Sequence, residues 1–389
     1  MLIKVYKQRK KSINPPVFLR KCGLVICFSL LLVACFSLVA HAEEEFGEVS
    51  DWLARLQAIL PDAIREDVSL SDMEDATNLV GIPYLVSLIY DSLMGRAPHF
   101  FGLFASLAGL ALLGGIGAIL CDGLTIEGAK KSVQVTVSVG LALTVYHCVE
   151  GALSRGFSAV EDMTAFTSAL VPIMGSVYVA GGNYTTAATQ AGGMALMMSQ
   201  ISNLFQWLLM PLLSACFAFA LLGALGTGVD TSSLAKSMKQ IFLTVTGLMA
   251  TIFSASMALQ TTLSASADGV AMKTAKYALG QMIPSVGSTV SGTLSTMAAS
   301  LGLVKSSIGV GSVGILLTML IPPLAELFLY QLSLSLAGAF SGLLGFREGE
   351  RLFLAFKGIF DMALGMVSMT AVMLLLSVGV FMKTTLAVG

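Results

Sequence analysis

The chain has 389 residues, of which 56% are apolar and only 12% charged, and its mean hydropathy is +0.85. A soluble domain is about 45–50% apolar and about 25% charged, so this composition excludes a cytosolic globular enzyme and a disordered protein. The formal net charge of −1 provides no basic field for nucleic acid. We therefore expect an all-α, polytopic helical membrane protein in a lipid bilayer, with short extracytoplasmic amphipathic helices.

The amino terminus has the pattern of a targeting segment. Residues 1–21 hold seven basic residues and no acid, an apolar run extends from Cys22 to Val39, and Ala40-His41-Ala42 is a small-x-small cleavage pattern. These features predict a signal peptide over 1–42. Two alternatives stay open: an uncleaved anchor, because about 18 apolar residues can span a bilayer, and lipidation at Cys35. All three place residue 43 outside the cytoplasm.

Residues 43–99 are predicted to form an acidic extracytoplasmic helical region with an interfacial helix. Its apolar residues recur at helical spacing near the start, at Trp52, Leu56, Ile59 and Leu60. The acidic stretch is either a solvated cap or a docking surface for an extracytoplasmic partner. The apolar run 82–94 is too short to span, so we expect an interfacial or re-entrant helix there.

Longer apolar runs predict a first membrane helix group over 100–263 and C-terminal membrane helices over 308–389. The spanning candidates are about 100–120, 133–154, 192–226, 241–263, 308–341 and 358–382, with 163–180 as a weaker seventh. We expect Pro322-Pro323 to break the fifth. With residue 43 outside, basic residues are about threefold denser in the loops 121–132, 227–240 and 343–357 than in the outer segments, as the positive-inside rule requires.

A Gly-, Ser- and Thr-rich region lies between these groups, over 264–307. After Pro284, apolar residues recur every three or four positions, at Val286, Val290, Leu294, Met297, Leu301 and Val304. This narrow stripe predicts a helix whose small residues allow close packing. The region is either a packed extracytoplasmic hairpin or a re-entrant helix that lines a pore or contacts a partner.

Polar residues inside the predicted spans are candidate functional residues, because an ionisable group in a membrane segment is costly. Glu326 follows the proline pair and precedes Gln331. Its carboxylate could hold a cation or a proton, or it could be hydrogen-bonded inside the bundle. On the sequence alone, we expect Glu326→Gln to leave assembly intact. Asp361 lies four residues after Lys357, which favours a helix-end ion pair over a transport role.

Other local patterns carry weaker signals. His147 and Glu150 lie three residues apart, a spacing that places both on one helix face within reach of each other. Gly338 and Gly342 form a GxxxG pair, which indicates a close helix crossing. The common nucleotide-binding, metalloprotease and serine-hydrolase motifs are absent from the sequence. We expect no catalytic residue, cofactor or metal site, and any energy-coupled process would need a partner ATPase.

Several segments together resemble the stage III sporulation protein AE family. They are the signal segment, the acidic start that follows it, and the stretches DGVAMKTAKYALGQMIPSVGSTVSGT, LLTMLIPPLAELFLY and FREGERLFLAFKGIFDMALGMVSM. The resemblance covers nearly the whole chain, in order. It implies a multi-pass protein of the mother-cell membrane around the forespore. It also implies a subunit of a channel or secretion-like complex with other membrane proteins, needed for late forespore gene expression and spore formation.

Two other functions stay open on the sequence alone. A self-sufficient small-molecule permease would show an internal repeat with matching broken helices in both halves. A membrane scaffold without a conduit of its own would share every sequence feature described above.

Overall fold

Long helices make up the part of the chain that the computed structural model describes, which is 50–60, 79–122, 127–204, 237–259 and 287–383, with a few single positions between 207 and 219. The helices are α3 (Ser50–Ala58), α6 (Ile82–Asp122), α7 (Glu127–Ala180), α8 (Tyr184–Leu204), an unlabelled helix at Ser237–Leu259, α11 (Gly287–Leu343) and α12 (Arg347–Lys383). Every regular element in these ranges is a helix, which confirms the all-α prediction. The predicted signal peptide and Val286 lie outside the described residues.

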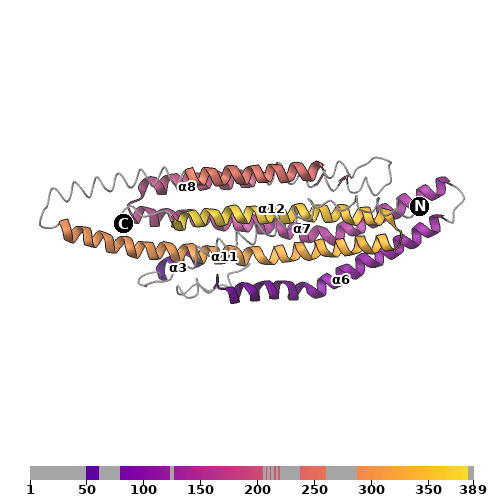
Figure 1. Cartoon of the computed structure of the whole chain (residues 1–389), viewed down its shortest axis with the longest axis horizontal. Coiled ribbons are helices and arrows are strands. Elements are labelled where there is room, and N and C mark those ends of the chain that lie inside the picture. The colour runs from indigo at the N-terminus through magenta and orange to yellow at the C-terminus, as the bar shows by residue number, and fades with distance from the viewer. Residues whose placement is uncertain are drawn as a thin grey trace, which may run out of the picture. The chain divides into compact units, whose positions relative to one another are not determined.

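Helix α11 is the central element of the bundle. It packs against α6, α7 and α12, and Figure 1 shows α12 running back alongside it. Every residue from Ser307 to Leu320 is buried, as expected for a helix that is apolar on all sides. The buried hydroxyls in this stretch donate to carbonyls four residues earlier, from Ser307 to Leu303, from Ser312 to Ile308 and from Thr318 to Gly314. These hydroxyls therefore need no water-filled cavity.

The stripe predicted after Pro284 falls partly on the first turns of α11. The helical backbone there confirms the predicted helix from Gly287 onward. Val290, Leu294 and Met297 lie in this segment, but their side chains fall outside what the structure describes. Their role in a pore or at a partner contact stays a prediction.

The turn between α11 and α12 is closed by a glycine and a buried phenylalanine. Gly345 has φ +75°, and the amide of Phe346 donates to the carbonyl of Ser341 at 3.0 Å, which is the Schellman arrangement at a helix end. The Phe346 ring is 3% exposed. It fills the space beside Gly114 and Gly349, where an added Cβ would lie 2.3 Å from its Cε1. The carboxyl-terminal part of α6 therefore lies at this turn.

The opposite end of the bundle is marked by Tyr178, Lys305 and Phe381. The Lys305 ammonium lies 6.0 Å from the centroid of the Tyr178 ring and 5.9 Å from that of Phe381. These residues bring together the end of α7, the buried part of α11 and the end of α12. Helix α3 packs on α11 and α7, and its Leu56 and the following Leu60 are buried. A docking role for the rest of the acidic region stays a prediction.

The helices are longer than the sequence predicts. Helix α6 is continuous from Ile82 to Asp122. The prediction of a separate interfacial helix at 82–94 is therefore wrong. Helix α7 joins the predicted spans 133–154 and 163–180. Helix α11 passes through Pro322-Pro323 without ending, so the predicted break is wrong as well. Neighbouring helices stabilise a buried helix at a proline, because they satisfy or shield the backbone groups that the proline leaves free.

Five helices in the described residues are long and apolar enough to cross a membrane. They are Ile82–Gly117, Val135–Ala180, Ser237–Leu259, Leu301–Leu343 and Arg347–Lys383, with 36, 46, 23, 43 and 37 residues. A bilayer core of about 30 Å needs only about 20 helical residues. Four of the five are therefore long enough to extend well beyond the hydrocarbon. Arg96 and Arg155 lie inside two of these helices, so they do not count toward the charge of the outer loops.

Candidate functional site

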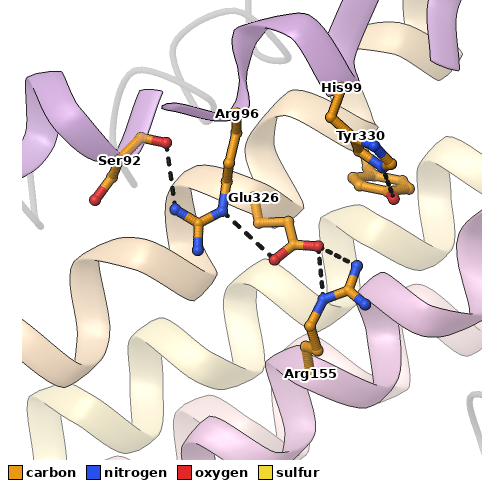
Figure 2. Close-up of polar contacts among 6 residues, drawn as sticks. All are labelled: Ser92, Arg96, His99, Arg155, Glu326 and Tyr330. Atoms are coloured by element: carbon orange, nitrogen blue, oxygen red, sulfur yellow. Dashed lines mark hydrogen bonds and ion pairs between the residues drawn. The ribbon is translucent and has the colours of Figure 1, made fainter. Parts of the chain in front are cut away.

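A carboxylate bound by two arginines lies near the middle of α11. Glu326 accepts a hydrogen bond at its Oε1 from Nε of Arg155, at 2.8 Å, and a second one from Nη2 of the same guanidinium. Nε of Arg96 lies 3.6 Å from Oε2. Figure 2 shows the two guanidiniums on opposite sides of the carboxylate, one from α6 and one from α7. We call Arg96, Arg155 and Glu326 the arginine–glutamate cluster.

In the arginine–glutamate cluster the carboxylate is buried, whereas the two guanidinium groups are partly exposed to the surroundings. The side chain of Glu326 is 11% exposed, compared with 37% for Arg96 and 57% for Arg155. Arg96 also donates to the carbonyl of Ser92 at 3.4 Å. Charge-assisted bonds from guanidinium to carboxylate are among the stronger polar contacts in proteins. Because protein cations already bind this carboxylate, a free cation could bind there only by displacing an arginine.

One turn further along α11, Tyr330 extends the contacts between helices. Its hydroxyl lies 2.8 Å from Nε2 of His99 on α6 (Figure 2). Its ring stacks on Phe360 of α12, with 5.6 Å between centroids and 9° between planes. Tyr330 thus connects α6 to α12 across α11.

A second charged cluster surrounds Asp361 on α12. Its carboxylate accepts from the Lys239 ammonium and from the Gln331 amide, and the Lys357 ammonium lies 3.6 Å away. The structure thus contains the Lys357–Asp361 ion pair that the local spacing predicts. It also joins Gln331 to Asp361, whereas Glu326 belongs to the separate arginine–glutamate cluster. Each cluster contains two cations and one carboxylate.

The predicted glycine pair lies at the contact between α11 and α12. A Cβ at Gly338 would lie 3.5 Å from Phe353 and Leu354, and one at Gly342 would lie 3.0 Å from the Glu350 carboxylate. The close crossing indicated by the GxxxG pattern is therefore present. A functional role for Glu326, Gln331 and Asp361 stays a prediction.

The outward face of α7 is polar within a span-length helix. Its exposed polar residues recur at helical spacing, with Leu143 and Ala165 in the same register; they are His147, Glu150, Ser154, Ser158, Glu161 and Ser168. We call these residues the α7 polar face. The rings of Tyr146 and His147 lie 5.7 Å apart. The outward face of α6 is apolar by contrast, with exposed Leu112, Leu113, Ile116, Ile119 and Leu120.

Sequence reasoning missed four of the residues that contact Glu326, Tyr330 or Asp361: Arg96, His99, Arg155 and Lys239. Arg96 is the only lysine or arginine in 82–122, and Arg155 is the only one in 132–180. A buried or membrane-embedded cation needs an anionic partner. That requirement is the signal that could have paired them with Glu326.

A family model and a curated relative both connect this chain to the same protein family. The family model of stage III sporulation protein AE matches residues 101–385, a range that contains Arg155, Glu326 and Asp361. The stage III sporulation protein AE of Bacillus subtilis strain 168 is 24% identical over 222 residues, which cover 56% of this chain and 55% of that protein. The match thus spans about half the length of that relative, and no solved structure matches. Since the family model covers well over half of the sequence, the chain belongs to the stage III sporulation protein AE family.

Proposed function

We propose that this protein is a multi-pass membrane subunit of a sporulation channel or secretion-like complex that connects the mother cell and the forespore. In this role it supports late forespore gene expression and spore formation. It lies in the mother-cell membrane around the forespore and assembles with other membrane proteins of the complex, including a partner ATPase. Membership of the sporulation family and the five span-length helices support the proposal.

The α7 polar face is the observation that favours a subunit over a self-contained permease. Its acids Glu150 and Glu161 lie on the outside of the chain, within the span-length segment Val135–Ala180. Exposing a charged carboxylate to lipid costs about 2.5–3.5 kcal/mol or more at the bilayer centre. A partner subunit, or a water-filled path enclosed between subunits, removes that cost. A bundle surrounded only by lipid would have to bear it.

Photo-crosslinking in sporulating cells tests this proposal. A photoreactive residue at Ser158, on the α7 polar face, is expected to form adducts with other proteins of the sporulation complex, identified by mass spectrometry. The same residue at Ile116, on the apolar face of α6, is the matched control and is expected to form no protein adduct. Recovery of the Ser158-labelled chain without protein adducts, together with purification of the chain alone, would argue against the proposal.

A further inference from the structure

The α7 polar face lies at a level where the neighbouring helices expose apolar side chains. The arginine–glutamate cluster fixes this level, because it joins α6, α7 and α11 at one point (Figure 2). Near the cluster, Met94 and Phe101 of α6 are 53% and 65% exposed, and Phe328 of α11 is 50% exposed. Such surfaces on span-length helices face hydrocarbon. The α7 polar face therefore stands out as a charged strip beside surfaces suited to lipid.

The charge on this side of α7 is negative. Glu150, Glu161 and Asp162 are exposed, and among the residues that the structure describes none of the three is in an ion pair. The arginine–glutamate cluster nearby holds two cations and one carboxylate. Three carboxylates against one surplus cation leave a net charge of −2. Charged groups at membrane depth pair with opposite charges, so the missing counter-charges are cations.

Small residues separate the two glutamates. Between Glu150 and Glu161, the same side of α7 carries Gly151, Ser154 and Ser158. Small side chains allow the backbone of another membrane helix to approach closely, and serine hydroxyls can bond across the contact. The two glutamates are eleven positions apart, which is close to three helical turns, so they lie on one face roughly 16 Å apart. This arrangement fits a helix crossing with an acid on either side of it.

The charge also decides which kind of helix fits. A two-fold contact with a second copy of the chain would pair the α7 polar face with itself, because such an interface uses the same surface twice. That pairing would place carboxylates opposite carboxylates, and like charges repel. A helix with basic side chains at two levels, about three turns apart, supplies the counter-charges instead.

We propose that the α7 polar face binds a transmembrane helix of a different protein, which carries lysine or arginine side chains opposite Glu150 and Glu161. Ser154 and Ser158 lie at the crossing between the two helices. This inference rests on the proposed function, since it names the chemistry of the partner subunit. Loss of both charged contacts is expected to weaken the association roughly tenfold, the effect of removing two polar contacts between membrane helices.

Photo-crosslinking from Ser158 in sporulating cells measures the association. The segment crosslinked to the otherwise unchanged chain, identified by mass spectrometry, is expected to be a transmembrane helix of another protein with lysine or arginine near the adduct. Glu150→Gln/Glu161→Gln is expected to lower the adduct yield roughly tenfold. Glu150→Asp/Glu161→Asp is the matched control, because it keeps both carboxylates, and it should keep most of the yield.

Charge reversal separates an ion pair from general packing. Glu150→Lys/Glu161→Lys should abolish the adduct, and replacing the basic residues of the crosslinked segment with glutamate should restore it. An adduct that persists in the lysine variant, a segment without basic residues, or a segment from a second copy of this chain would overturn the proposal. These results would leave the subunit function standing, whereas the absence of any protein adduct from the unchanged chain would contradict both.

Thermal unfolding in detergent shows whether the lysine variant still folds. If that variant unfolds, the glutamine variant decides the question. A glutamine variant that melts like the wild type and forms fewer adducts supports the proposal. One that keeps the full adduct yield contradicts it.

Discussion

Glu326→Ala is expected to lower the free energy of unfolding by about 3 kcal/mol, because it leaves the guanidiniums of Arg96 and Arg155 without their carboxylate. Breaking a buried ion pair by removing one partner costs about 3–5 kcal/mol. The lower end applies here, since both arginines are partly exposed. Thermal unfolding of the purified chain in detergent measures the loss. Glu150→Ala, which removes an exposed acid from α7, is the control and should melt close to the wild type.

A double variant shows whether the unpaired charge causes that loss. Glu326→Ala/Arg155→Ala removes one of the two stranded guanidiniums and should recover part of the lost stability. Glu326→Gln should also destabilise the chain, because a neutral amide replaces the acceptor of two cations. The ion pairs thus revise the expectation from sequence that this substitution leaves assembly intact. Wild-type melting of Glu326→Ala would show that the arginine–glutamate cluster contributes nothing to stability.

Phe346→Ala is expected to cost about 3–5 kcal/mol, the usual range for truncating a buried phenylalanine. The ring is 3% exposed and fills the space between Gly114 of α6 and Gly349 of α12. Its removal opens a cavity at the turn that holds three helices together. Chemical or thermal unfolding in detergent reports the change. The neighbouring Leu343→Ala is the matched control, because this side chain is 86% exposed, and it should change stability little. Equal melting temperatures of the two variants would contradict the role of Phe346.

Short-range patterns in the sequence predicted several contacts correctly. The Lys357–Asp361 pair and the crossing at Gly338 and Gly342 follow from spacings of four residues, because a helix places such residues on one face. The buried Leu56 likewise follows from the apolar period near the start of the chain. These contacts could be predicted because helical geometry alone determines which residues face the same way.

Long-range pairing explains most of what the sequence did not predict. Arg155 and Glu326 are 171 positions apart, and no local pattern connects them. Arg96 and Arg155 also interrupt the apolar runs of α6 and α7, which makes each continuous helix look like two shorter segments in the sequence.

We propose that the helices cross the membrane as one bundle, with the α11–α12 turn and the α7–α8 turn on opposite sides. Cysteine accessibility in intact bacterial cells tests it most directly, with Tyr184→Cys and Arg347→Cys introduced singly into a chain whose native cysteines are replaced. Tyr184 is 67% exposed next to the α7–α8 turn, and Arg347 begins α12. A membrane-impermeant maleimide is expected to label Tyr184→Cys in intact cells and Arg347→Cys only after permeabilisation. Labelling of both positions from the outside would contradict this topology.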